Sequence, residues 1–391
     1  MRNAGRCTVV VALGVALLAG CTDGDHDDAP PASAAAAGPA GVVTQAAWSE
    51  IPDGGPPPRI GALVAWLGDA FVVVGGVDGA PCPANASCIS PPPDARHRDG
   101  AAYDPQTRHW TAIADAPTVL RDSDSAAVVD GVLYVQAVPV DSTAVTLLAY
   151  DHGKDEWTQR APGPCSGRLT AYRHVVLCAS ATDERGVTPD AVYDPAADSW
   201  SELPDDPLAP SFDRNLSVVG DHIIVTANDL SSVSGSTPPV VHLAELDPSL
   251  KTWTRLPDSE VVGTATPIAT DDGLVFPETG TSDGGEVNGW GRAYPNGGIY
   301  DVEKRTWGPL PGPAVPGSTP SPLVGAGDRA VTGIAVIDVG AGTSVGLPDV
   351  PWQRERDQPS FAASPTSVLA WGGAADQTAL GYLLELEPSE S

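Results

Sequence analysis

Positive charge is scarce in this chain. The 391 residues include 21 lysines and arginines against 50 aspartates and glutamates, which gives a formal net charge of -29 at pH 7. Only three of the basic residues are lysines. Such an acidic chain repels the phosphate backbone of nucleic acids. Nucleic acid is therefore excluded as a partner.

Catalytic and metal-binding motifs are also missing. The sequence contains no phosphate-binding glycine loop and no Ser/His/Asp motif in a recognisable context. Its seven histidines are scattered, without the paired spacing of a metal site. We therefore predict no metal, no cofactor and no catalytic residue.

Long amphipathic helical periods are absent after residue 20. In their place the chain has 42 glycines and 40 prolines, a proportion that suits a turn-dense all-β protein. Hydrophobic residues make up 42% of the chain, enough to bury a substantial core. The composition thus favours many short strands.

What the chain does contain is a repeated hairpin. An apolar run ends in Tyr-Asp or Leu-Asp, a turn that often begins Asp-Pro follows, and the chain returns through Trp. The Trp positions are separated by 47, 43, 53 and 54 residues, which suits units of four short strands in a β-propeller. A large indole can fill the wedge between neighbouring blades. The copies are Tyr103 to Trp110, Tyr150 to Trp157, Tyr193 to Trp200, Leu246 to Trp253, Tyr300 to Trp307, and a weaker sixth copy from Ile337 to Ser344.

The two ends of the repeat region complement each other. The segment 382–388 has no Trp strand after it, and the segment 47–52, which contains Trp48, has no Tyr-Asp strand before it. Joining them completes a seventh blade and removes the open edges that would invite aggregation. We predict an all-β, seven-bladed β-propeller over residues 45–391, closed by its N-terminal strand, and we expect a monomer.

These motifs resemble the kelch family of β-propellers. The resemblance rests on the Tyr-Asp-Pro turns, the Trp that follows, the Leu/Ile-Pro after it, and the strand end Val73-Val74-Gly75-Gly76. It covers roughly residues 45–391, although paired glycines return only at Gly372-Gly373. The resemblance implies a propeller fold. Some relatives of this family are sugar-acid epimerases or mutarotases, which need Arg, Glu and His at the channel mouth. The resemblance therefore also implies a possible acid–base site, for which His97, Glu278 and Glu286 are the candidates.

The N-terminus reads as a signal peptide over residues 1–20. Arg2 and Arg6 precede an apolar run from Val9 to Ala19 that is too short to span a membrane. The sequence Leu-Ala-Gly-Cys at 18–21 resembles a bacterial lipobox, which implies lipidation of Cys21. Residues 21–44 are acidic and then Ala/Pro-rich, as in a flexible tether. We expect an outward-facing protein held on the cell membrane by its lipid; the alternative is ordinary secretion with Cys21 as a free thiol.

Four cysteines remain in the exported body. An even number outside the cytoplasm predicts two disulfides, for which three pairings are possible. Proximity in the sequence favours Cys82 with Cys88 and Cys165 with Cys178. A zinc site is the rival interpretation, but no histidines lie near these cysteines.

The strand order of a blade separates two faces of the propeller. The loop that leads into strand one and the loop between strands two and three lie on the same side, here termed the loop face. The two tight turns of each blade lie on the other side, here termed the hairpin face. The loop face receives the insertions, including 277–297 with Trp290, Arg292 and Tyr294. Long loops on a rigid scaffold commonly carry binding residues.

Four arginines lie near the start of a first strand: Arg59, Arg121, Arg168 and Arg214. Each lies an even number of residues before its hairpin, so in the absence of a bulge the side chains point the same way. We predict a basic sector beside the channel that binds a carboxylate through guanidinium groups. In the alternative, each arginine ties its own loop to the ring.

The leading hypothesis is a lipid-anchored binding module outside the cell that has no chemistry of its own. Its partner would be a protein, a peptide or an acidic carbohydrate, and its only link to the membrane would be the lipid. The alternatives are a carbohydrate-active enzyme of the epimerase or mutarotase kind at the channel mouth, and a structural envelope scaffold.

Overall fold

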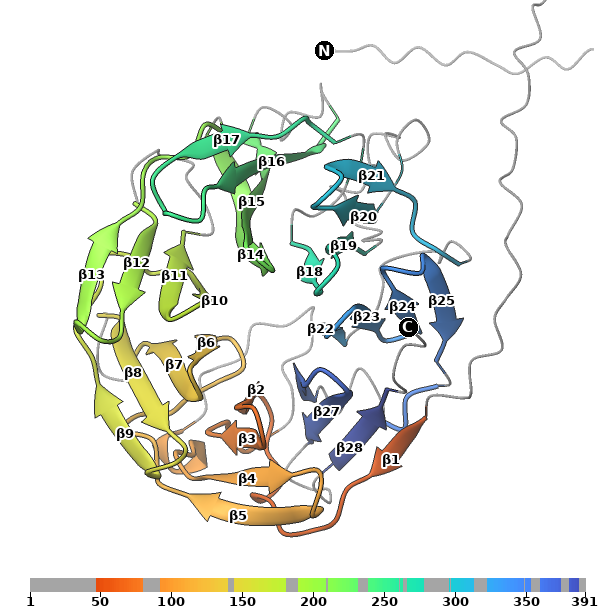
Figure 1. The fold of residues 1–391 in the computed structure, drawn as a ribbon. Coiled ribbons are helices and arrows are strands. Elements are labelled where there is room, and N and C mark those ends of the chain that lie inside the picture. Colours follow the sequence, from red (N-terminus) through yellow and green to blue (C-terminus); the bar gives the residue numbers. More distant parts are fainter. Residues whose placement is uncertain are drawn as a thin grey trace, which may run out of the picture. The chain divides into compact units, whose positions relative to one another are not determined.

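The described part of the chain consists almost entirely of β-strands. The computed structural model describes residues 47–79, 92–139, 144–180, 189–208, 210–230, 238–259, 261–262, 266–277, 295, 297–312, 322–347, 349–352, 359–373 and 380–386. They form seven four-stranded antiparallel sheets, together with one 3-10 turn, η1 (Pro93–Ala95). The sheets stand as blades around a central channel (Figure 1). The predicted seven-bladed, all-β propeller is confirmed. No helix in the described ranges is long and apolar enough to cross a membrane.

The strands of each blade run from the channel outward. Blade one contains β2 (Leu63–Trp66), β3 (Phe71–Val74), β4 (Gly100–Asp104) and β5 (His109–Ile113). Blade two contains β6 (Ser125–Val129), β7 (Val132–Ala137), β8 (Thr146–Asp151) and β9 (Glu156–Gln159). Blade three contains β10 (Arg168–Tyr172), β11 (Val175–Ala179), β12 (Ala191–Asp194) and β13 (Ser199–Glu202). Blade four contains β14 (Ser211–Val219), β15 (His222–Asp229), β16 (Val241–Leu246) and β17 (Trp253–Arg255).

The remaining blades follow the same order. Blade five contains β18 (Ile268–Ala269), β19 (Leu274–Phe276), β20 (Gly298–Asp301) and β21 (Thr306–Gly308). Blade six contains β22 (Leu323–Ala326), β23 (Arg329–Thr332), β24 (Ala335–Asp338) and β25 (Thr343–Gly346). Blade seven contains β26 (Ser360–Ala363), β27 (Ser367–Gly372), β28 (Leu380–Glu385) and β1 (Trp48–Glu50).

The N-terminal strand closes the ring. In Figure 1, β1 runs beside β28 as the outermost strand of blade seven. Trp48 lies opposite Leu384, and Glu50 lies opposite Tyr382. The Ile51 N–H continues the pairing by donating to the Gly381 carbonyl oxygen at 2.9 Å. The predicted closure is therefore confirmed.

The repeated hairpin joins strands three and four of the blades. Its Tyr and Trp are direct cross-strand neighbours, as at Tyr103 and Trp110, and the weaker sixth copy aligns Ile337 with Ser344 in the same register. The turn aspartate accepts backbone hydrogen bonds, as Asp104 does from the N–H groups of Gln106 at 2.8 Å and Thr107 at 3.2 Å. The expected role of Asp in the turn is thus confirmed.

The indoles also connect neighbouring blades. Each of four Trp Nε1–H groups donates to a backbone carbonyl just beyond the last strand of the preceding blade, so the indole fills the wedge and also fixes the blade spacing. The four bonds are Trp110 to Pro52 at 3.0 Å, Trp157 to Ala114 at 3.0 Å, Trp200 to Ala161 at 2.9 Å and Trp253 to Pro204 at 2.7 Å.

The core lies between the blades. One buried cluster combines Val72 and Ala102 of blade one with Leu133, Val135 and Tyr150 of blade two. Similar clusters join the other neighbouring blades. Because every blade buries its faces against two neighbours, the ring is a continuous core.

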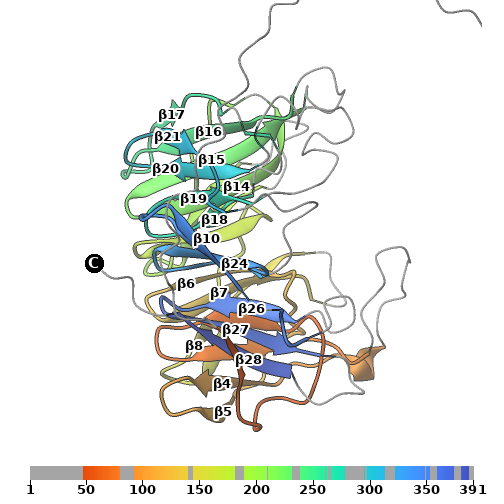
Figure 2. The same cartoon turned by 90° about the vertical axis from the view of Figure 1, so that its right-hand side faces the viewer.

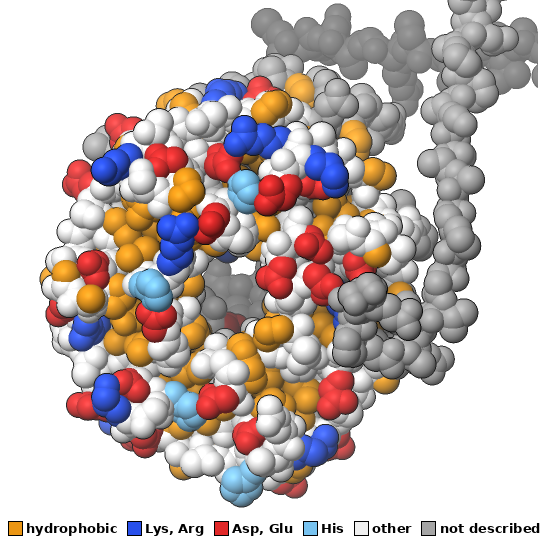
Figure 3. All heavy atoms as spheres, in the orientation of Figure 1, with side chains coloured by type: hydrophobic (Ala, Val, Ile, Leu, Met, Phe, Trp, Pro, Cys, Tyr) orange, Lys and Arg blue, Asp and Glu red, His pale blue; other side chains and the backbone are white. Residues whose placement is uncertain are grey.

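The two faces of the ring differ as expected. Figure 2 views the ring from its rim, with the tight turns on one side and η1 on the other. Figure 3 views the hairpin face, where basic, acidic and histidine side chains are interspersed around the hollow of the channel.

Candidate functional site on the loop face

Arg59 is fully buried in blade one, just before β2. Its Nη1 and Nη2 donate to the two carboxylate oxygens of Asp99 at 2.9 and 3.0 Å. The same guanidinium donates to the carbonyl oxygens of Gly75 at 3.0 Å and Pro57 at 3.2 Å. Hydrogen bonding and the charge of Arg59 hold the pKa of Asp99 below its usual value. Each of the three guanidinium nitrogens therefore donates to at least one protein oxygen.

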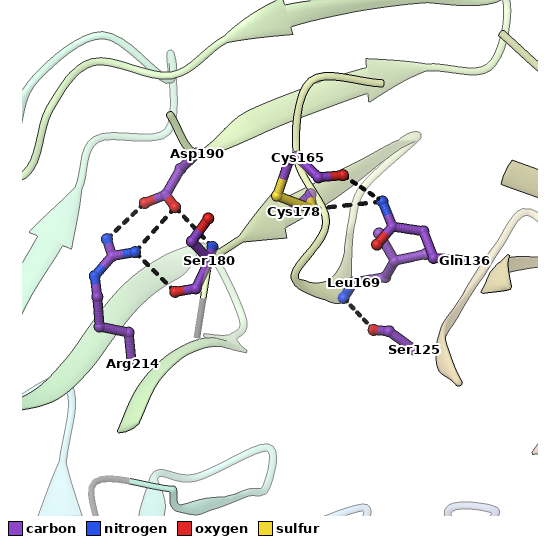
Figure 4. The surroundings of a disulfide bond; sticks show 8 residues. All are labelled: Ser125, Gln136, Cys165, Leu169, Cys178, Ser180, Asp190 and Arg214. Atoms are coloured by element: carbon purple, nitrogen blue, oxygen red, sulfur yellow. Dashed lines mark hydrogen bonds and ion pairs between the residues drawn. A yellow bond between two sulfur atoms is a disulfide. The ribbon is translucent and has the colours of Figure 1, made fainter. Parts of the chain in front are cut away.

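Arg214 is buried in blade four and reaches back to blade three (Figure 4). Its Nη1 and Nη2 donate to the Asp190 carboxylate at 3.1 and 2.7 Å, and Nη2 also donates to Asp206 at 2.6 Å. Nη1 donates to the Ser180 carbonyl oxygen at 2.9 Å. One cation thus balances two carboxylates that are themselves more than nine-tenths buried.

The two arginines perform the same task in different blades. Gly75 and Ser180 each directly follow a second strand, and Asp99 and Asp190 each directly precede a third strand. Each guanidinium therefore clamps together the two ends of a loop between strands two and three. This is the anchoring arrangement, in which an arginine ties a loop to the ring.

Paired glycines make room for the blade-one clamp. Gly75 and Gly76 have φ values of 77° and 87°, which side chains rarely tolerate. A Cβ at Gly75 would lie 2.2 Å from the Leu120 carbonyl oxygen, and one at Gly76 would lie 3.0 Å from the Arg59 side chain. The glycine pair therefore lets the chain entering blade two cross directly over the strand end.

The Cys165–Cys178 disulfide connects the chain entering blade three with β11 (Figure 4). The sulfur atoms are 2.08 Å apart and the Cα atoms 6.1 Å apart. Gln136 of β7 donates to the Cys165 carbonyl oxygen at 2.9 Å, which links the disulfide to blade two. This predicted pair is confirmed. Cys21, Cys82 and Cys88 lie outside the described residues.

Arg121 and Arg168 differ from the two clamps because both side chains are exposed. Arg121 lies just before β6 and Arg168 begins β10, so both stand where the inner strands meet the loop face. Within the described ranges, neither guanidinium has an ion pair or a hydrogen bond to a carboxylate. These two arginines are therefore open to a ligand from solvent.

Hydrogen bonds of the backbone hold in place the loop-face sector that carries Arg121 and Arg168. The Arg121 N–H donates to the Asp124 carboxylate at 2.9 Å, and the Asp124 N–H returns a bond to the Arg121 carbonyl oxygen at 3.0 Å. The Leu169 N–H, next to Arg168, donates to Ser125 Oγ at 2.6 Å. Blades two and three are thus joined between the two exposed arginines.

Two carboxyl groups share this sector with Arg121. Partial desolvation raises the pKa of Asp122 above its usual value, although a backbone hydrogen bond and the charge of Arg121 act against it. Burial likewise raises the pKa of Asp124. The sector therefore combines two permanent cations with two carboxyl groups that bind protons more readily than free aspartate.

The sequence indicates where the four arginines lie but not what distinguishes them. Arg214 lies in a β-bulge between Phe212 and Asn215, so the even spacing that predicts a common direction for the four side chains does not hold there. Arg59 and Arg121 precede their strands instead of lying on them. The carboxylate partners Asp99 and Asp190 were not predicted. Their position directly before an apolar third strand is the sequence feature that could have indicated them.

Of the acid–base candidates of the enzyme alternative, His97 is the one that lies in the described residues. His97 Nε2 lies 2.7 Å from Asp78 Oδ1, and His97 Nδ1 lies 3.7 Å from Asp99 Oδ1, so both ring nitrogens face carboxylates at the base of the blade-one loop. Among the described residues, no group of three or more His, Cys, Asp or Glu side chains could hold a metal ion. Outside the described residues lie Glu278, Glu286, Trp290, Arg292 and Tyr294.

Comparison with known proteins does not place this chain in a family. No protein-family model matches this chain, and no curated protein matches its sequence. The class of the protein is therefore defined by its fold, a seven-bladed β-propeller with an arginine-bearing sector on the loop face of blades two and three.

Proposed function

We propose that this propeller is a binding module that holds a carboxylate-bearing ligand on its loop face through Arg121 and Arg168. The observation that carries the proposal is the contrast among four arginines at comparable positions. The side chains of Arg59 and Arg214 are buried and paired with carboxylates, whereas the guanidinium groups of the other two are exposed without a carboxylate partner in the described ranges. Exposed guanidinium groups suit forked hydrogen bonds to a carboxylate.

The proposal places this module outside the cell. The apolar run that ends in Cys21 resembles a lipoprotein signal, and the body resembles kelch propellers. Lipidation of Cys21 would hold the propeller on the outer side of the cell membrane. Labelling cells with a radioactive fatty acid tests this part, since Cys21→Ser should abolish incorporation into the chain. Unchanged labelling of that variant would contradict the anchor.

Binding is tested on the compact unit of residues 41–391 by calorimetry. The probes are glucuronate, galacturonate and a short peptide with a free C-terminal carboxylate; the matched controls are glucose, galactose and the peptide amide. We expect binding of at least one acid and of none of its neutral counterparts. Binding of acids and neutral forms alike would remove the role given to the guanidinium groups.

The variants Arg121→Gln and Arg168→Gln should each weaken binding about 10-fold or more, as is usual when one charged hydrogen bond is lost. Arg173→Gln is the matched control, because Arg173 is exposed but pairs with Asp221 on the hairpin face. It should leave the affinity unchanged. Equal loss in all three variants would indicate general electrostatic attraction instead of a site.

A carbohydrate-active enzyme is the second candidate. The observation that favours it is the raised pKa of Asp122 and Asp124 beside Arg121, since partial desolvation of a carboxyl group favours the protonated form that a general acid needs. Proton NMR of the bound sugar acid in D₂O tests this candidate. Catalysed change of anomer or epimer that is lost in Asp122→Asn would establish an enzyme, and an unchanged sugar would leave the binding module.

A further inference from the structure

His222 lies between two carboxylates at the junction of blades four and five. Its Nδ1 is 2.6 Å from Glu245 Oε1 of β16, in the same blade, and its Nε2 is 3.3 Å from Glu303 Oε1 in the β20–β21 turn of blade five. Only the protonated imidazole can donate to both. The contact across the junction therefore depends on the charge of one ring.

Arg305 crosses the same junction from the blade-five side. Its Nη2 donates to Glu245 Oε2 at 2.6 Å. With His222 protonated, two cations balance the two carboxylates, and each carboxylate has a cationic partner. When His222 loses its proton, a ring lone pair faces one carboxylate, and one negative charge is left over.

The other charged groups near this ring are already paired. Asp221, the preceding residue in the β14–β15 turn, accepts from Arg173 Nη2 at 2.8 Å. Asp301 of β20 accepts from Lys304 Nζ at 2.5 Å. Glu245, Glu303 and Arg305 are thus the groups left to respond to the charge of His222.

Within the described ranges, this junction lacks the indole bond that joins other blades. Trp307, the blade-five counterpart of Trp253, has a buried Nε1–H with no hydrogen-bond partner among the described residues. Blade five also has short inner strands, with two residues in β18 and three in β19. Polar contact between blades four and five therefore rests on the His222 cluster more than at the junctions with an indole bond.

We propose that His222, Glu245, Glu303 and Arg305 form a proton-dependent latch between blades four and five. The latch is closed while His222 is charged and loosens when the ring becomes neutral. Burial opposes the charge on the ring, but hydrogen bonds to Glu245 and Glu303 outweigh burial and raise the pKa of His222 above its usual value. The stabilisation is therefore complete below the pKa of unfolded histidine and is lost as pH rises through the higher folded pKa.

Hydrogen exchange of the full chain followed by mass spectrometry tests the latch, at about pH 6, below the usual histidine pKa, and at about pH 9, well above it, because the folded pKa is raised. Peptides covering β20 and β21 are compared with a peptide covering β8 in the same sample, which cancels the intrinsic effect of pH. We expect exchange in β20 and β21, relative to β8, to be about two- to five-fold faster at the higher pH, the size of a partly exposed ion pair. An unchanged ratio would overturn the proposal.

Two variants separate the latch from a general effect of pH. In His222→Gln and in Glu303→Gln, exchange in β20 and β21 relative to β8 should be fast at both pH values. Glu303 is 82% exposed, so its variant should fold. The control is His174→Gln, which removes an exposed pair with Asp130 between blades two and three and should leave the change in β20 and β21 intact. A pH-dependent ratio that survives in His222→Gln would show that another group is responsible.

Discussion

Trp48 lies directly opposite Leu384, so the first described strand of the chain, β1, completes the sheet that contains the last strand, β28. The indole packs edge-on against Trp352 with a centroid distance of 4.9 Å and belongs to the cluster that contains Leu384. This contact holds a ring that would otherwise be open.

Trp48→Ala should lower the free energy of unfolding by about 3 kcal/mol, the usual cost of removing a large aromatic side chain from a packed site. Denaturant unfolding followed by circular dichroism measures it. Glu50→Ala, an exposed change on the same strand, should stay within about 0.5 kcal/mol. Equal effects of the two variants would mean that the indole contributes nothing to closure.

The indole bonds between blades can be measured with a matched pair. Trp157 donates to Ala114, whereas Trp307 has no such bond among the described residues, and each packs on a Tyr of its own blade at 4.9 and 5.2 Å. Trp157→Phe should therefore destabilise the protein by about 1 kcal/mol more than Trp307→Phe, the net value of one hydrogen bond. Indistinguishable unfolding curves would refute this value for the bond.

The two arginine clamps should differ in strength. Arg214→Gln leaves Asp190 and Asp206 buried without a counter-charge and should cost about 3–5 kcal/mol. Arg59→Gln should cost less, about 1–3 kcal/mol, because the Asp99 side chain is 49% exposed and water can replace its partner. Adding Asp190→Asn to Arg214→Gln should recover part of the loss in thermal unfolding. No recovery would show that packing, and not the buried charge, dominates.

The disulfide should stabilise the protein by restricting the unfolded chain. Cys165 and Cys178 close a loop with a sequence separation of 13, for which the loss on removal is about 3 kcal/mol. The double variant Cys165→Ala/Cys178→Ala should show this loss by guanidinium unfolding, as should the wild type after reduction. A reductant that lowers the stability of the double variant equally would point to another disulfide.

The Arg59–Asp99 pair predicts acid sensitivity. The hydrogen bond and charge of Arg59 hold the pKa of Asp99 below the value of unfolded aspartate, so its stabilisation is complete above about pH 4 and is lost as pH falls through the folded pKa. The melting temperature of Asp99→Asn should therefore fall less steeply below about pH 4 than that of the wild type. Asp69→Asn, at an exposed turn of the same blade, should follow the wild-type curve.

Much of the fold could be predicted because its signals are local. A Tyr-Asp or Leu-Asp turn and the returning Trp mark the outer hairpin in five blades, and Ile337 with Ser344 holds the same register without either aromatic. Complementary half-blades at the two ends predicted closure. Proximity in the sequence was enough to predict the pairing of Cys165 with Cys178.

The site was predictable only in part, because the roles of its arginines depend on distant residues. Arg59 and Arg121 look alike in the sequence, but the guanidinium of Arg59 pairs with Asp99 across a long loop, whereas that of Arg121 has no carboxylate partner in the described ranges. The bulge at Arg214, whose side chain reaches blade three, likewise leaves no clear pattern in the sequence.

By itself, the sequence determined the repeat, the number of blades, the closing strand and one disulfide, since hydrophobic period, turn chemistry and short loop closure act over a few residues. Only the tertiary structure decided which arginines are clamps and which are exposed, and that a protonated His222 can join blades four and five. Those outcomes depend on which charges meet when remote segments pack, and electrostatic pairing at 3 Å is set by the three-dimensional arrangement of the ring.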